Sequence, residues 1–152
     1  MKTIYDKLKK TDIGWRFINN DKVIFDEKSI NDIIINSREK SKKEWKKITG
    51  SSEGHLFKLP NSFWRNLNKI SCVNITWDDD NQRQCISSFI KEDDKILFFW
   101  GKYNSIFVSG GTFLKYWDDF CYPGDDNDMI IIYEKNLLIT FVDDIFILYS
   151  LK

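Results

Sequence analysis

The spacing of apolar residues changes near the middle of the chain. Before about residue 70 it fits a helical period, with one helix predicted over residues 29–48 and ended by Gly50, and a shorter one over residues 61–67. From Cys72 onward, short runs alternate or are wholly apolar, as strands are: "CVNITW", "QCISSFI", "KILFFW" and "YNSIFV". The first half is therefore predicted to be mainly helical and the second half mainly extended.

The stretch "SGGTFLKYWDDF" interrupts the strands and predicts a helix at about residues 110–120, with aromatic pairs Phe113–Trp117 and Tyr116–Phe120 at a spacing of four. Three further strands follow, "MIIIYE", "LLITFV" and "IFILYS", joined by short turns. We expect an α+β fold. In it, N-terminal helices pack on a largely antiparallel sheet, and the helix at about 110–120 precedes a C-terminal three-stranded meander.

Length and composition predict one folded domain over residues 1–152. The chain is 42% hydrophobic and 16% aromatic, which excludes disorder as its main state. Its longest apolar runs are strand-sized, well below the ~20 residues of a membrane span, and the N-terminus lacks the apolar centre of a signal peptide. We expect a cytoplasmic protein with no membrane contact and with reduced thiols at its three cysteines.

Charge is balanced overall but not along the chain. Residues 1–70 hold 16 Lys and Arg against 9 Asp and Glu, whereas residues 71–152 hold 7 against 14. Such asymmetry indicates either a polar surface for a partner or two halves whose charges interleave on packing. The sequence leaves both interpretations open.

The acidic stretch "KYWDDFCYPGDDND" at residues 115–128 does not have the ligand spacing of a metal site. A calcium loop that started at Asp125 would place Met129 and Ile130 where an oxygen ligand and a glycine are required. His55 and the three cysteines are separated by 17, 13 and 36 residues, which is not the close spacing of a zinc site. We expect no metal and no other cofactor.

Catalytic and nucleic-acid motifs are also missing from the sequence. His55 is the one histidine and lies in a polar loop, no Gly-x-Ser-x-Gly elbow occurs, and "VSGGTF" lacks the Gly-Lys ending of a phosphate loop. The basic segments "KKTDIGWR" and "REKSKKEWKK" could touch phosphates, but lysine alternating with glutamate on a helix is typical of a solvated face. We expect neither an enzyme nor a nucleic-acid partner.

Aspartates cluster at the turns between predicted strands. Alternate turns of an antiparallel sheet share one end, so several clusters can form a negative patch beside aromatic residues. Such a patch could steer a basic protein by charge, with aromatics as anchors; solubilising turn residues are the plain alternative. The candidate partner-binding residues are Asp78, Asp79, Asp80, Asp118, Asp119, Tyr122, Asp125, Asp126 and Asp128.

The aromatic pattern resembles a bacterial family designated domain of unknown function 2947. The matching segments are "WRF" at residues 15–17, the helix around Trp45, and Phe113, Trp117 and Phe120 before a final hairpin; Gly111 stands near the place of a further Trp. The resemblance covers most of the chain and implies a single domain of this length. Its motifs are core positions, so it implies a fold and no chemistry.

The chain is also similar in type to bacterial immunity proteins, which are small cytosolic proteins that neutralise toxin domains of contact-dependent inhibition and other polymorphic toxin systems. We therefore expect an immunity protein, a monomer or weak dimer, that covers the active or substrate-binding surface of a cognate toxin domain, and we expect that toxin to be a nuclease. In this interpretation Trp117 and Phe120 point inward and the neighbouring aspartates outward. The alternative is a small enzyme or ligand-binding domain with a pocket between helix 110–120 and the sheet.

Overall fold

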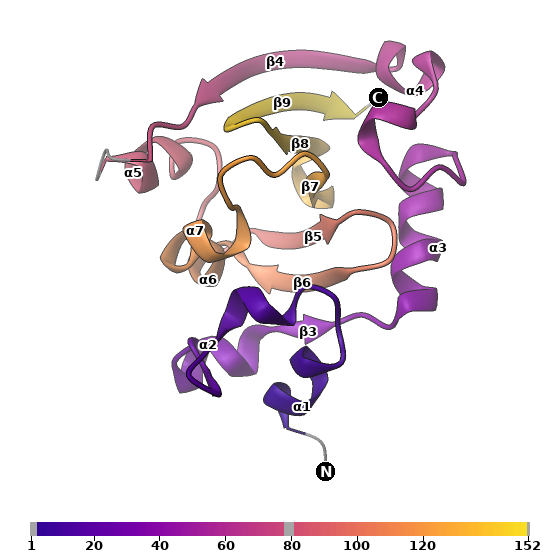
Figure 1. Cartoon of the computed structure of the whole chain (residues 1–152). Helices are drawn as coiled ribbons and strands as arrows, with labels where there is room; N and C mark the ends of the chain where they lie inside the picture. Colours follow the sequence, from indigo (N-terminus) through magenta and orange to yellow (C-terminus); the bar gives the residue numbers. More distant parts are fainter. Residues whose placement is uncertain (1–2, 78–80, 152) are drawn as a thin grey trace.

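A computed structural model of the chain describes residues 3–77 and 81–151. Within these ranges seven strands form one antiparallel sheet, with β4 at one edge and β3 at the other (Figure 1). In order across the sheet the strands are β3 (Ile34–Ile35), β6 (Ser105–Ser109), β5 (Lys95–Trp100), β7 (Asp128–Ile132), β8 (Leu137–Val142), β9 (Ile145–Leu151) and β4 (Leu67–Asn74). A separate hairpin pairs β1 (Ile18–Asn19) with β2 (Lys22–Val23).

Helices cover both faces of the large sheet (Figure 1). One face packs against α1 (Ile4–Lys9), η1 (Gly14–Phe17), α2 (Glu27–Asp32), α5 (Gln82–Ile86), α6 (Gly110–Lys115) and α7 (Trp117–Phe120). The other face packs against α3 (Arg38–Thr49), η2 (Leu56–Lys58) and α4 (Asn61–Arg65), and η3 (Tyr133–Lys135) joins β7 to β8. The expected α+β class is confirmed. None of the helices in the described ranges has both the length and the apolar character needed to cross a bilayer.

The wholly apolar run of β5 reflects its place between two cores. Successive side chains of a strand point to opposite faces, so Phe98 contacts Phe113 and Phe120 at ring-centroid distances of 5.8 and 5.5 Å. Its neighbour Phe99 meets Trp45 of α3 at 5.4 Å on the other face. Apolar side chains on both faces of β5 are therefore needed, because helices pack against the sheet on its two sides.

The C-terminal meander forms as predicted, with β7, β8 and β9 paired in order. Its tight turns use residues that tolerate left-handed backbone: φ is +50° at Asn136, +50° at Asp143 and +65° at Asp144. Trp117 and Phe120 point inward as predicted, exposed by 7% and 0%.

The predicted helix at 110–120 breaks into α6 and α7 at Tyr116, whose hydroxyl hydrogen-bonds the carboxylate and the backbone N–H of Asp26. The start of α6 lies directly on the turn before β5. The N–H groups of Gly110 and Gly111 donate to the carbonyls of Asp94 and Glu92 at 2.8 and 3.0 Å. A Cβ on Gly110 would lie 1.7 Å from a backbone oxygen. The glycine pair thus serves close packing.

Two other predicted elements are wrong. The helix expected over residues 29–48 is α2, the short strand β3 and α3, because the β-branched run Ile33–Ile35 is extended and pairs with β6. The strand expected at "QCISSFI" is helix α5 and the turn after it. Ile86 and Ile90, four apart, are both fully buried, whereas Ser88, which an alternating strand would bury with them, is exposed, so the helical period prevails.

Candidate functional site

The loop Cys121–Asn127 joins α7 to β7 and organises one end of the sheet. Two backbone hydrogen bonds fix it to the neighbouring turns: Gly101 donates to the carbonyl of Asn127 and Asp143 to that of Asp125, both at 2.9 Å. A third bond, 3.1 Å long, runs from the N–H of Gly124 to Oδ1 of Asp144. Three connections far apart in sequence are therefore held together here.

Carboxylates of α7, the loop and the β8–β9 turn gather at this end, which we call the acidic end. Its members are Asp118, Asp119, Asp126, Asp143 and Asp144. Asp118, Asp126 and Asp143 are exposed. Asp119 and Asp144 are half-buried. By contrast, the acidic cluster before β5 lies at the opposite end of the sheet, where Asp94 pairs with Lys135 at 2.8 Å.

Exposed aromatic side chains border the acidic end. Trp15 of η1 is 59% exposed and meets the ring of Tyr122 edge-on at 5.0 Å. Phe57 is 68% exposed and stacks on His55, whose Nε2 lies 3.4 Å from Oδ1 of Asp126. Aromatic rings that are left exposed beside charge are the usual anchors of protein interfaces.

A buried ion pair fixes these aromatics to the loop. Arg16 donates from Nη1 and Nη2 to the two carboxylate oxygens of Asp125 at 2.9 and 2.8 Å, and from Nη1 to the carbonyl of Phe120 at 3.1 Å. Its guanidinium also lies 5.0 Å from the Trp15 ring and 4.7 Å from the Tyr122 ring. Nη1 thus makes two hydrogen bonds and Nη2 one, and these contacts hold Arg16 beside both aromatic rings.

Two of the predicted partner-binding residues do not point outward. Asp128, in β7, is 3% exposed and forms a carboxyl–carboxyl hydrogen bond with Asp125. Burial, and then this bond, raise the pKa of Asp128 to about 10, so it carries a proton at neutral pH. Burial alone would raise the pKa of Asp125, but the hydrogen bonds from Arg16 and Asp128 bring it below its ordinary value. The expectation of outward carboxylates is wrong for both residues.

The remaining predicted residues are placed as follows. Asp78, Asp79 and Asp80 lie outside the described residues. Asp118, Asp119 and Asp126 belong to the acidic end, and Tyr122 is half-buried beside them. Burial, followed by the charge of Asp118, raises the pKa of Asp119 to about 6.

Sequence reasoning missed Trp15 and Arg16 as parts of this site. The signal was present in "GWRF", where a cation stands between two aromatics, but it was assigned to the core. Of the three side chains in that segment, only that of Phe17 lies fully in the core, at 1% exposure, whereas Trp15 is exposed.

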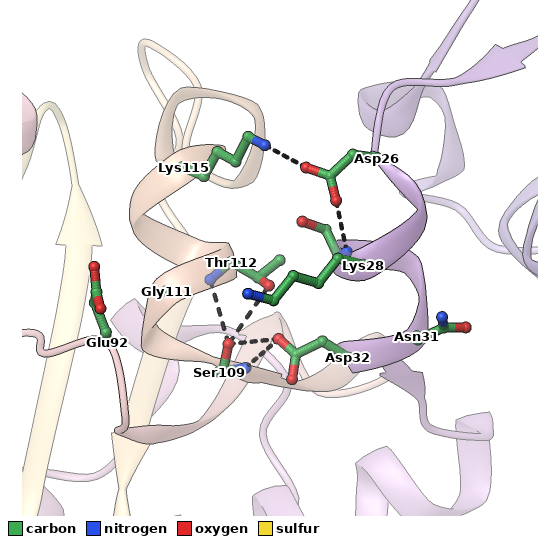
Figure 2. A pocket seen from close by; sticks show the side chains of 10 residues that line it. Asp26, Lys28, Asn31, Asp32, Glu92, Ser109, Gly111, Thr112 and Lys115 are labelled. Carbon is green, nitrogen blue, oxygen red and sulfur yellow. Dashed lines mark hydrogen bonds and ion pairs between the residues drawn. The ribbon is translucent and has the colours of Figure 1, made fainter.

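The pocket expected between helix 110–120 and the sheet is filled with aromatic side chains. Phe113 and Phe120 are fully buried there, and Trp117 stacks on Trp77 at 5.3 Å. A cleft of about 640 Å³ lies instead on the outer side of α6, facing α2 (Figure 2).

Two acids of this outer cleft, Asp26 and Asp32, take part in contacts between α2 and the α6 segment. Asp26 caps α2 through the N–H of Ser29 and pairs with Lys115, and Asp32 accepts hydrogen bonds from the N–H and hydroxyl of Ser109 (Figure 2). These contacts tie α2 to α6, so the acids in the cleft have structural roles.

The described part of the chain holds no cluster of metal-ligand side chains. There, no three His, Cys, Asp or Glu side chains converge as ligands would. Cys121 is fully buried near Asp128, and burial raises the pKa of its thiol, whereas Cys72 and Cys85 are exposed.

Comparison with known proteins gives one match. The model of a family described as "Protein of unknown function (DUF2947)" matches residues 5–148. No curated protein and no solved structure matches the chain.

Proposed function

The chain belongs to the DUF2947 family of proteins of unknown function, and from that premise we propose that it is a protein-binding module: an immunity protein that neutralises a cognate toxin domain in the bacterial cytoplasm. The observation that supports this proposal is the acidic end, where five carboxylates lie on the same end of the sheet as the exposed Trp15 and its partner, the half-buried Tyr122. The proposal assigns no cofactor and no catalytic step to the chain.

Electrostatics favours a basic partner for such a surface. A nuclease binds phosphates through a basic site, so a carboxylate-rich surface can cover that site in place of the nucleic acid. Exposed carboxylates at the rim would act mainly through the association rate. Trp15, which exposes 59% of its surface, would supply buried contact area and slow dissociation.

Rigidity supports the same interpretation. Association costs less free energy when the binding residues are already ordered. The pair Arg16–Asp125 holds Trp15 and the loop together without help from a partner, and the turn bonds to Gly101 and Asp143 fix the loop from two further sides. The surface is therefore preorganised.

The direct test is co-expression of the chain with the C-terminal toxin domain encoded by the adjacent gene. We expect growth to be restored and the two chains to co-purify in equal amounts. Trp15→Ala should weaken both effects while the variant remains folded. A toxin domain that stays active and unbound in the presence of the folded chain would overturn the proposal.

A further inference from the structure

Helix α3 presents a strongly basic face to solvent. Its exposed cations are Arg38, Lys40, Lys42, Lys43, Lys46 and Lys47. Among the described residues, none of them forms an ion pair within 4.0 Å. The charge separation seen in the sequence thus persists in the fold on this helix.

The two glutamates of α3 do not neutralise this face. Glu39–Lys43 and Glu44–Lys47 have helical spacing, yet neither pair closes to ion-pair distance. Glu44 instead accepts a hydrogen bond of 3.1 Å from the hydroxyl of Tyr133. The cations of this face are therefore exposed to solvent, as the alternating charges predict, but they are not paired with the glutamates of their own helix.

Regular spacing distinguishes this face from scattered surface lysines. Arg38, Lys42 and Lys46 follow one another at intervals of four, so their Cα atoms rise about 6 Å from one to the next. Like charges at this spacing repel and destabilise a helix. An anionic partner with regularly spaced charges would remove that repulsion.

Aromatic rings accompany the cations at both ends of α3. The guanidinium of Arg38 lies 4.0 Å from the ring centroid of Tyr103, and Nζ of Lys47 lies 5.5 Å from that of Tyr133. These two tyrosines are 37% and 42% exposed. Their rings are therefore accessible beside the cations.

A groove of about 490 Å³ extends the basic face at the N-terminal end of α3. Lys7 of α1 and Lys10, which directly follows that helix, line it together with Arg38 and Tyr103, while Asp12 contributes a single acid. Cations from two helices thus border one continuous path.

We propose that the solvent face of α3 and this groove bind the phosphate backbone of a single-stranded nucleic acid, with bases stacking on the flanking tyrosines. Single-strand sites combine a cationic track with aromatic platforms in this way. A protein partner would need an apolar centre, because charged residues are depleted at the centre of protein interfaces. A membrane-binding helix would present apolar residues to the lipid, whereas Trp45 of α3 is buried in the core.

The test is fluorescence anisotropy of a labelled 12-nucleotide oligouridine with the full chain at 50 and 200 mM salt. Contact with about four phosphates predicts an affinity about 50-fold lower at the higher salt. The triple variant Lys42→Gln, Lys43→Gln, Lys46→Gln should bind the oligonucleotide at least tenfold more weakly than the parent chain at 50 mM salt. Between 50 and 200 mM salt its affinity should fall only about threefold. The matched control, Lys22→Gln, Lys28→Gln, Lys69→Gln, removes three exposed cations elsewhere and should retain most of the affinity.

Stacking is tested separately with Tyr133→Ala. This change should weaken oligouridine binding about fivefold or more and leave binding of polyphosphate, which has charges but no bases, unchanged. The inference fails if oligouridine does not bind at 50 mM salt, or if both triple variants lose the same affinity. It also fails if polyglutamate or phosphatidylserine vesicles bind α3 more tightly than the oligonucleotide. Toxin binding by the α3 variant reports independently on the proposed function.

Discussion

Arg16 and Asp125, 109 positions apart in the chain, form a bidentate ion pair with N–O distances of 2.9 and 2.8 Å. Their side chains are 9% and 13% exposed, so the pair is largely shielded from water. It connects η1, which carries Trp15, to the loop at the acidic end. One interaction therefore sets the relative position of an aromatic anchor and the carboxylates around it.

Breaking this pair from one side should be costly. Arg16→Met leaves the carboxylate of Asp125 buried without its cation, and loss of one partner of a buried pair typically costs about 3–5 kcal/mol. We expect the free energy of unfolding from urea titration at pH 7 to fall by roughly that amount.

The double variant Arg16→Met, Asp125→Asn removes both charges and leaves an oxygen that can accept the hydrogen bond from the N–H of Tyr122. It should recover most of the lost stability. A double variant whose loss equals the sum of the two single losses would show that the pair is not coupled.

Asp128 should make stability depend on pH in an unusual direction. Burial, and the hydrogen bond with Asp125, raise the pKa of Asp128 to about 10 in the folded chain, against about 3.9 when unfolded. The folded state therefore keeps a proton that the unfolded state releases above about pH 4, and this group's contribution to stability declines as pH rises from about 4 toward 10. Asp128→Asn cannot ionise, and its amide can still donate to Asp125.

We expect the variant to gain stability relative to the parent chain between pH 5 and 8, by up to about 1.4 kcal/mol per pH unit in urea unfolding. Asp126→Asn, an exposed carboxylate nearby, is the matched control and should parallel the parent. A constant difference between parent and Asp128→Asn over this range would mean that Asp128 is ionised in the fold.

Local signals were sufficient to predict much of the fold. The meander follows from short apolar runs joined by turn residues such as Asp143-Asp144, and both signals lie within a few positions of each other. Helix α5 was missed because it is little more than one turn long, and only the exposure of Ser88 between the buried Ile86 and Ile90 distinguishes the segment from a strand. At the break between α6 and α7, the hydroxyl of Tyr116 contacts Asp26, which is distant in sequence.

The candidate site was harder to predict because contacts between residues far apart in the sequence position its side chains. "DDND" suggests four equivalent turn residues, yet Asp126 is exposed while Asp128 is paired with Trp100 and Phe141 inside the sheet. The difference arises where β7 begins, which the sequence does not reveal. Arg16 could not be assigned to Asp125 from any local pattern.

Two tryptophans should separate binding from stability. Trp117 is 7% exposed and stacked on Trp77, so Trp117→Ala should cost about 3–5 kcal/mol of unfolding free energy. Trp15 is 59% exposed, so Trp15→Ala should change stability by at most about 1 kcal/mol, yet weaken toxin binding by about 2 kcal/mol or more. Urea unfolding and calorimetric titration measure the two effects. If Trp15→Ala instead lowered stability and left toxin binding unchanged, Trp15 would not belong to the interface.

The exposed carboxylates of the acidic end should act through the rate of association. Asp118→Asn, Asp126→Asn and Asp143→Asn together remove three exposed charges without adding bulk. Because rim charges attract a partner over distances comparable to the Debye length, about 8 Å at physiological salt, association with the basic toxin domain should slow by about tenfold and lose much of its salt dependence. Dissociation should change little, since the anchors remain. Stopped-flow mixing at two salt concentrations measures both rates, with Lys42→Gln, Lys43→Gln on α3 as the comparison. Unchanged association in the aspartate variant, together with a large loss in the lysine variant, would move the toxin interface to α3.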